Sequence, residues 1–290
     1  MTKRKTLKEL TIKDNFMFGA VMCEEENCKQ LLELILGFPI ERVEVSTEKC
    51  IVYHPEYKGV RLDVYAKDEN NTHYNVEMQA VVQRSLGKRA RYYHSQIDME
   101  LVAAGVEYSV LPKAYVIFIC DFDPFGQGKY LYTFRHLCQE SADVRLEDES
   151  ETIFLSTKGQ NPTEVAAELV KFLEYVQADL ENSITDFNDD FVGKLQKSVH
   201  RIKQNRRMEE RYMLTELLMQ DERRAGRIEG RNEGRLEGRK ESILEILSEL
   251  GEVPESIRLQ IRKEDSLDKL KNWAKLVVKA ETIEQFAERM

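Results

Sequence analysis

Apolar and polar residues alternate along residues 59–80, and this alternation predicts a β-hairpin. Successive side chains of a strand point to opposite faces, so a period of two is typical of a half-buried strand. Residues 67–71, with the sequence KDENN, provide polar turn chemistry between the two arms. The apolar members of both arms carry even numbers: Val60, Leu62, Val64, Tyr74, Val76, Met78 and Ala80.

The parity of these positions predicts which residues lie opposite each other. In an antiparallel pair the numbers of opposite residues have a constant sum, and a turn centred on Asn70 makes that sum 140. Asp63 then lies opposite Glu77, with their Cβ atoms about 5 Å apart, and Gln79 shares their face. Two carboxylates this close repel each other unless a cation lies between them, and hard cations such as Mg²⁺ prefer carboxylate oxygens. The alternative is a solvated carboxylate pair on the outer face of the hairpin.

The remaining pattern predicts a mixed α/β core followed by helices. Residues 114–120, AYVIFIC, are apolar almost throughout, which is typical of a central strand covered on both faces. Asp121 and Asp123, in the loop that follows, are two further carboxylates that could bind a metal. Other strands are expected at 41–53, 130–137 and 152–156, and helices at 24–37, 84–104, 163–178 and 188–222, with short helices over 242–290.

Basic residues recur in the helix expected directly after the hairpin. Arg84, Lys88 and Arg91 have spacings of four and three, which place them on one helical face. This face begins five residues after Gln79, close to the carboxylate pair. Two interpretations stay open, a solvated basic face and a face that contacts the phosphates of DNA.

Residues 226–241 contain a repeat of four residues, with Gly, Arg and Glu each recurring at every fourth position. Arg and Glu are never three or four residues apart, so a single helix lacks the usual ion pairs, and each glycine costs a helix about 1 kcal/mol. A partner helix would compensate, because the glycine row permits close approach and the charged rows can pair between chains. We therefore expect a homo-oligomer through the helical region 188–241. A flexible linker and an Arg stripe that binds DNA are the alternatives.

Charge and cysteine content narrow the class of protein. The net charge of −9 argues against DNA binding over the whole surface, although phosphate binding depends on local basic patches. The five cysteines show no CxxC spacing, which indicates reduced, mostly buried thiols in a cytoplasmic protein and argues against a zinc site. No apolar run approaches ~18 residues, so no membrane span is expected.

Several short motifs, taken in order, resemble the PD-(D/E)XK nuclease family transposases, the recombination-promoting nuclease group. The resemblance covers about residues 5–160. It implies an α/β, restriction-endonuclease-like fold, with a mixed central sheet flanked by helices and an all-α C-terminal extension. The motifs are Asp14 to Phe18, Arg61 to Val64, Glu77-Met78-Gln79, Arg89 to Tyr93, Gly105 to Tyr108 and Tyr115 to Ile119.

The resemblance also implies roles for individual residues. Asp63 and Glu77 would bind Mg²⁺ or Mn²⁺, with the Met78 carbonyl as a further ligand. Gln79 takes the place of the family's lysine, and its amide can hydrogen-bond a water but brings no positive charge. Arg91 and Tyr93 match a family motif and could position the scissile phosphate, while Tyr93 could equally pack in the core.

Two acidic residues nearer the N-terminus are auxiliary candidates. Asp14 belongs to the first family motif, but it could simply cap the following turn. Glu33 lies on the first long helix, which sometimes contributes an acid to the site in this nuclease class, but it could equally be an exposed helix carboxylate.

The sequence therefore predicts a Mg²⁺-dependent DNA endonuclease of transposase or recombination-promoting type, with low sequence specificity. The catalytic residues would be Asp63, Glu77 and Gln79, and Arg84, Lys88 and Arg91 would bind DNA. The alternative is a catalytically weak or inactive protein that keeps the nuclease fold and acts as an oligomeric DNA- or protein-binding module. The expected segments are a core at 1–160, a helical extension at 161–225, the repeat at 226–241 and a helical module at 242–290.

Overall fold

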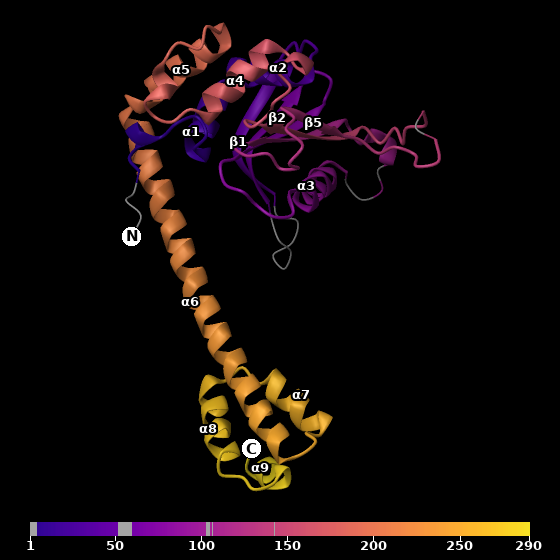
Figure 1. The fold of residues 1–290 in the computed structure, drawn as a ribbon, viewed down its shortest axis with the longest axis vertical. Coiled ribbons are helices and arrows are strands. Elements are labelled where there is room, and N and C mark those ends of the chain that lie inside the picture. Colours follow the sequence, from indigo (N-terminus) through magenta and orange to yellow (C-terminus); the bar gives the residue numbers. More distant parts are fainter. Residues whose placement is uncertain (1–4, 52–59, 103–104, 106, 142) are drawn as a thin grey trace. The chain divides into compact units, whose positions relative to one another are not determined.

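The computed structural model describes residues 5–51, 60–102, 105, 107–141 and 143–290. The chain forms two compact units, Met1–Tyr212 and Met213–Met290 (Figure 1). The first unit contains the sheet and the predicted carboxylate pair, and the second unit is helical.

A six-stranded mixed sheet forms the centre of the first unit, in the order β1-β2-β3-β4-β6-β5. Strands β1, β2 and β3 are antiparallel, β3, β4 and β6 run parallel, and β5 pairs antiparallel with β6. The apolar strand at 114–120 is central, as predicted. The strand bounds are β1 Val43–Ile51, β2 Val60–Asp68, β3 His73–Gln79, β4 Ala114–Cys120, β5 Leu131–Phe134 and β6 Ser150–Ser156.

The hairpin of β2 and β3 has the register that its parity predicts. Val64 lies opposite Val76, and Tyr65 lies opposite Asn75, which gives the sum of 140. The Asp68 carboxylate accepts hydrogen bonds from the backbone N–H groups of Asn70 and Thr72, so this side chain holds the turn. The turn therefore fixes the register that brings Asp63 and Glu77 together.

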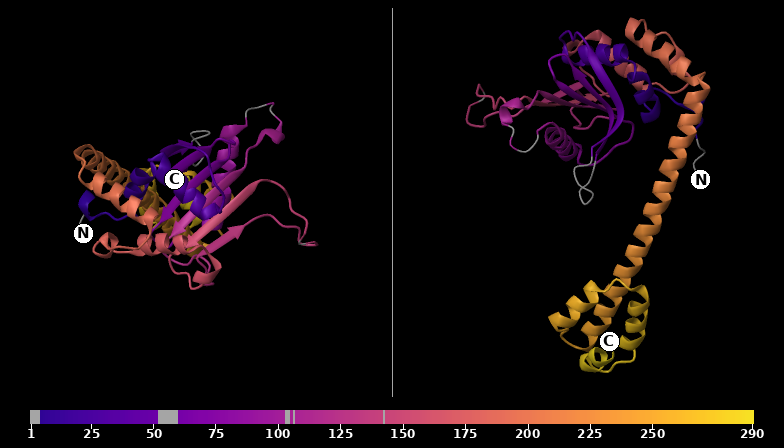
Figure 2. Two further views of the ribbon diagram at one scale, coloured as in Figure 1. Left: turned by 90° about the horizontal axis from the view of Figure 1, so that it is seen from above. Right: turned by 180° about the vertical axis from the view of Figure 1, so that it is seen from behind.

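Helices cover both faces of the sheet, as two views show (Figures 1 and 2). One face packs against α1 Asn15–Met22, α2 Glu25–Leu36, α4 Ala167–Gln177 and α5 Asp190–Lys203, and the other face packs against α3 Leu86–Leu101. The even-numbered residues of β3 enter the four-helix side of the core, so its odd-numbered residues lie on the α3 side. This layered core confirms the expected fold class.

Leu62 departs from the alternation. It is buried in the cluster on the α3 side, together with Tyr65 and Leu86, whereas Val64 packs on the other side. The single apolar face predicted for both arms is therefore wrong at this residue, because α3 provides a second apolar cluster that the hairpin pattern does not reveal.

The helix predicted at 188–222 is divided in two. α5 ends at Lys203, and α6 Arg206–Leu250 begins after a short break. The Asn205 side chain accepts hydrogen bonds from the backbone N–H groups of Arg207 and Met208, which satisfies free donors at the start of α6. The four-residue repeat lies entirely within α6.

The second unit has its own small core, made by the C-terminal part of α6 and three short helices. Trp273, the only tryptophan of the chain, packs in this core with Ile243 and Phe286. In the described part of the chain, no helix is both long and apolar enough to cross a membrane. The short helices are α7 Glu255–Lys263, α8 Leu267–Val277 and α9 Ile283–Arg289.

Candidate active site

The two predicted carboxylates lie next to each other on the hairpin. The backbone N–H of Asp63 donates to Glu77 Oε1 over 3.2 Å, and the backbone N–H of Met78 donates to Asp63 Oδ2 over 3.1 Å. Each carboxylate is thus held by the backbone of the opposite strand. Glu77 has no exposed surface and Asp63 is half-buried, so the solvated alternative is wrong for this pair.

Arg89, on the first turns of α3, binds both Glu77 and Gln79. Its Nη2 donates to Glu77 Oε2 over 3.0 Å, and its Nη1 donates to Gln79 Oε1 over 3.3 Å. Its Nε donates to the Tyr93 hydroxyl over 2.5 Å, and the guanidinium carbon lies 5.0 Å from the centre of the Tyr93 ring. The Tyr93 hydroxyl in turn donates to Glu77 Oε2 over 3.3 Å. The prediction of a basic face at 84, 88 and 91 missed Arg89, although its position as the first residue of the family motif Arg89 to Tyr93 was a signal that could have found it.

The electrostatics of the site follow from this burial. Desolvation, and then the charge of Asp63, raise the pKa of Glu77 to about 8, although the neighbouring Arg89 acts in the opposite direction. Burial and the charge of Glu77 also raise the pKa of the Tyr93 hydroxyl. The site therefore has an acid that holds its proton near neutral pH and a phenol that stays protonated.

Gln79 ends β3 and is almost completely buried. Its side-chain oxygen accepts from Arg89, and its backbone carbonyl accepts from the N–H of Asp121 over 2.9 Å. The sequence raised the concern that an amide in the place of the family's lysine brings no positive charge. Arg89 places a positive charge at this amide.

Asp14 lies outside this set of contacts. Its carboxylate accepts from Lys5 over 2.8 Å and from the backbone N–H of Thr11 over 2.7 Å, so it ties the N-terminal segment to the start of α1. Its neighbour Asn15 instead donates from Nδ2 to the Asp63 carboxylate, at 3.1 Å from Oδ2. Asn15 was missed by the sequence reasoning, although its position inside the first family motif was a signal that could have found it.

Glu33 is engaged elsewhere, since its Oε1 accepts from the backbone N–H of Ile40 over 2.9 Å. Arg84, Lys88 and Arg91 are exposed. Arg84 precedes the first residue of α3, so the single helical face predicted for the three residues is wrong at Arg84.

The donor set suits a hard divalent cation. Asp63 and Glu77 supply carboxylate oxygens, and each oxygen has lone pairs beyond those used by the N–H donors. Among the described residues, no cluster of three or more His, Cys, Asp and Glu side chains could hold a metal. A metal at this pair would therefore need oxygens from the backbone, from water or from a substrate phosphate. The Met78 carbonyl stays a predicted ligand.

The loop carboxylates after β4 have other partners. Asp121 accepts from Lys13 over 2.8 Å and from the Thr157 hydroxyl over 2.9 Å. Asp123 accepts from two backbone N–H groups of its own loop and from the Tyr132 hydroxyl. These contacts organise the loop.

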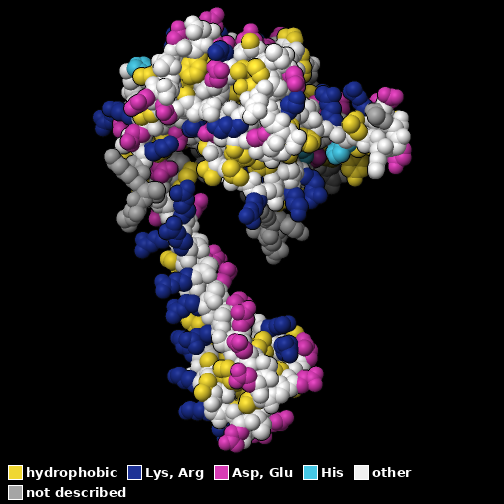
Figure 3. All heavy atoms as spheres, in the orientation of Figure 1, with side chains coloured by type: hydrophobic (Ala, Val, Ile, Leu, Met, Phe, Trp, Pro, Cys, Tyr) yellow, Lys and Arg dark blue, Asp and Glu magenta, His cyan; other side chains and the backbone are white. Residues whose placement is uncertain are grey.

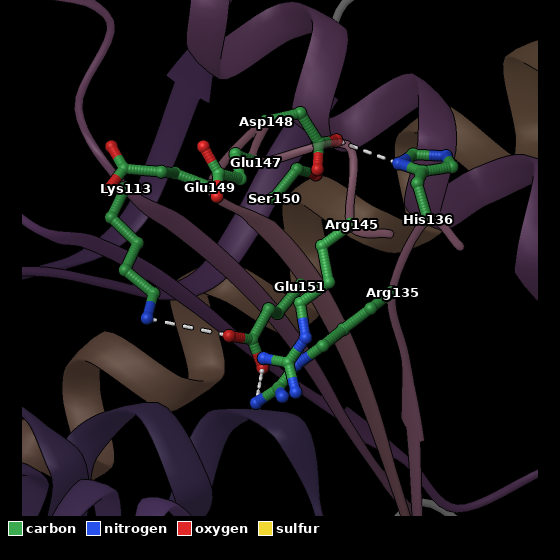
Figure 4. Close-up of a pocket in the computed structure, with 9 residues that line it drawn as sticks. All are labelled: Lys113, Arg135, His136, Arg145, Glu147, Asp148, Glu149, Ser150 and Glu151. Atoms are coloured by element: carbon green, nitrogen blue, oxygen red, sulfur yellow. Dashed lines mark hydrogen bonds and ion pairs between the residues drawn. The ribbon is translucent and has the colours of Figure 1, made fainter. Parts of the chain in front are cut away.

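A hollow of about 490 Å³ lies at the N-terminal ends of β4 and β6, away from the carboxylate pair (Figure 4). Lys113 and Arg135 both bind the Glu151 carboxylate, and His136 binds Asp148. Along β4, this end is about 20 Å from the Gln79 end. Its charged groups largely pair with one another, and none of the predicted site residues lines it.

The cysteines agree in part with the sequence. Cys28 and Cys120 are buried free thiols, and burial raises the pKa of each to about 12, which makes them poor nucleophiles. Cys23 is exposed and Cys138 is partly exposed, so the expectation of mostly buried thiols holds for two of the four described residues. Cys50 lies outside the residues whose side chains the structure describes.

Comparison with known proteins places this geometry in a family. Neither the curated proteins nor the solved structures gave a match. A family model described as PD-(D/E)XK nuclease family transposase matches residues 12–227, which include the hairpin carboxylates, Gln79, Arg89 and Asn15. This match supports a nuclease- or transposase-type function, for which DNA is the implied substrate. Because the match covers most of the chain, this protein belongs to the PD-(D/E)XK nuclease family transposases.

Proposed function

We propose that the protein is a Mg²⁺- or Mn²⁺-dependent DNA endonuclease of the recombination-promoting type. The observation that carries the proposal is the pairing of Asp63 and Glu77 beside an arginine that binds both Glu77 and Gln79. This constellation combines two hard ligands, a group that can orient water and a cation that can bind phosphate.

Asp63 and Glu77 would hold the metal. A bound divalent cation supplies positive charge at the phosphoryl and leaving oxygens and lowers the pKa of a bound water. Asn15 orients the Asp63 carboxylate, and the backbone N–H groups of the hairpin fix both carboxylates. These contacts reduce the reorganisation that binding requires.

Gln79 and Arg89 divide the role that a lysine has elsewhere in the family. The Gln79 amide can hydrogen-bond an attacking water, while the guanidinium of Arg89 stabilises the negative charge that develops on the phosphate. Tyr93 holds Arg89 through its hydroxyl and its ring. The second N–H of Nη2, beyond the one donated to Glu77, can donate to a phosphate oxygen.

The exposed Arg84, Lys88 and Arg91 would contact the DNA backbone near the carboxylate pair. Contacts to phosphates position a protein without reading bases, so we expect low sequence specificity. Their local positive charge is compatible with the net charge of −9, because affinity for phosphate depends on the patch that touches DNA.

A non-catalytic binding module with the nuclease fold is the second candidate, and the replacement of lysine by Gln79 favours it. We also propose a homo-oligomer through the helical region 188–241, in either case. Incubation of the pure protein with supercoiled plasmid and Mg²⁺ or Mn²⁺ separates the two candidates. An endonuclease converts the plasmid to nicked or linear DNA and stops in EDTA. Absence of cleavage with both metals would leave the binding module as the function.

A further inference from the structure

One stretch of α6 carries an apolar stripe that nothing in the described part of the single chain covers. Residues 221–235 are exposed on every side. The large apolar side chains before and within this stretch are half exposed or more: Leu214 59%, Leu217 51%, Leu218 58% and Ile228 54%. Helices in proteins gain most of their stability from packing. A stretch that is exposed on every side and contains several glycines therefore needs a partner.

Three of these apolar residues, Leu214, Leu218 and Ile228, have the spacing of a coiled coil. Residues 214, 218, 221, 225, 228 and 232 follow one another at alternating intervals of four and three, which is the seam of a heptad repeat. Leu214, Asp221 and Ile228 take the d positions, and Leu218, Ala225 and Asn232 take the a positions. A single asparagine at an a position selects a two-stranded, in-register pair, because it hydrogen-bonds its counterpart in the second helix.

Charges on the two flanks of the seam set the direction of the partner. Arg224 occupies a g position, and Glu229 occupies the e position five residues later. In a parallel pair, the residue at a g position faces the residue at the e position of the following heptad in the other chain. Arg224 of each chain therefore lies opposite Glu229 of the other, which gives two ion pairs. In an antiparallel pair, arginine would face arginine and glutamate would face glutamate. The space-filling view shows this separation, with basic side chains along one side of α6 and acidic ones along the other (Figure 3).

We propose that residues 214–232 are the seam of a parallel, two-stranded coiled coil formed with a second copy of this chain. The glycines of the repeat, at 226, 230, 234 and 238, lie outside this seam, so the proposed contact differs from the close approach of a glycine row. Asp221 is the one charged seam residue, and it weakens the dimer. The proposal goes beyond the nuclease activity and does not depend on it.

Sedimentation of the full-length chain over a range of concentrations tests the seam. The wild type should dimerise reversibly, and Leu218→Asp with Ile228→Asp should be monomeric. Asp221→Leu should tighten the dimer about tenfold or more. The three substituted residues, Leu218, Ile228 and Asp221, are exposed. Trp273 fluorescence reports whether the second unit remains folded. A wild type that stays monomeric, or a double variant that still dimerises, would overturn the seam.

Neighbouring arginines provide a matched control for direction. Arg224→Glu should weaken the dimer about tenfold or more, whereas Arg223→Glu, one residue earlier on the outer face, should leave it unchanged. Adding Glu229→Arg to Arg224→Glu should restore self-association. The restored variant should not mix with the wild type in a parallel pair, because like charges would then meet. Formation of mixed dimers would show an antiparallel pair and refute the proposed direction.

Discussion

Replacement of Glu77 by glutamine should change how the stability of the first unit depends on pH. Glu77 is completely buried beside Asp63, and its pKa is raised from 4.5 to about 8. Between these values the folded protein keeps a proton that the unfolded chain has lost, so unfolding releases a proton. The free energy of unfolding of the metal-free wild type therefore falls as pH rises through this window and becomes independent of Glu77 above it.

The size of this pH dependence follows from the single Glu77 proton that unfolding releases. The slope approaches roughly 1.4 kcal/mol per pH unit, so the wild type should lose roughly 2 to 3 kcal/mol between pH 5.5 and 7.5 relative to Glu77→Gln. The glutamine variant carries a neutral group throughout and lacks this slope. Its absolute stability also depends on how well the glutamine amide replaces the Glu77 carboxyl as the partner of Arg89, so the difference in slopes is the quantity to compare.

Denaturant unfolding in EDTA, followed separately for the two units, provides the assay. All twelve tyrosines precede Met213, and the only tryptophan, Trp273, lies in the second unit. Tyrosine fluorescence therefore reports the nuclease unit, while Trp273 serves as an internal control in the same sample. Glu33→Gln is the matched control variant, because Glu33 contacts the Ile40 backbone and not the carboxylate pair. Parallel pH profiles for wild type and Glu77→Gln would refute the burial and repulsion argument.

Three further predictions concern the metal and the cation at the site. Mn²⁺ affinity, measured by calorimetry, should rise between pH 6 and pH 8 because binding must displace the Glu77 proton; a flat profile would contradict the raised pKa. Arg89→Gln should slow plasmid cleavage roughly a hundredfold yet still bind Mn²⁺, because Asp63 and Glu77 remain. Arg91→Gln should keep the wild-type cleavage rate to within about tenfold. Equal losses in both variants would count against a special role for Arg89. Asn15→Ala should weaken Mn²⁺ binding about tenfold through Asp63, and unchanged affinity would remove Asn15 from the site.

The hairpin is the part of the molecule that the sequence predicts best. Alternation and a polar turn define faces and register with local information alone, and Asp63 and Glu77 lie within that local reach. The central position of β4 follows from its uniformly apolar composition, because only a strand covered on both faces is buried throughout.

Contacts between elements far apart in the chain were not predictable in the same way. The choice between Arg89 and its basic neighbours depends on how α3 packs over β3: Lys88 and Arg91 lie on the exposed side of that helix, and Arg84 precedes it. Asn15 reaches Asp63 across 48 positions of sequence, and no local pattern links the two. The packing of Leu62 against Leu86 of α3 likewise depends on a contact between elements that are separate in the sequence.

Plasmid cleavage by Asp63→Ala and Asp14→Ala, measured side by side in Mg²⁺ and in Mn²⁺, tests the central claim most directly. Both variants remove an aspartate from a family motif, but only Asp63 faces Glu77. Asp63→Ala should lose at least about a hundredfold in rate, and Asp14→Ala should retain activity in proportion to its folded fraction. Cleavage that survives in Asp63→Ala at the wild-type rate would contradict the carboxylate pair as the catalytic centre.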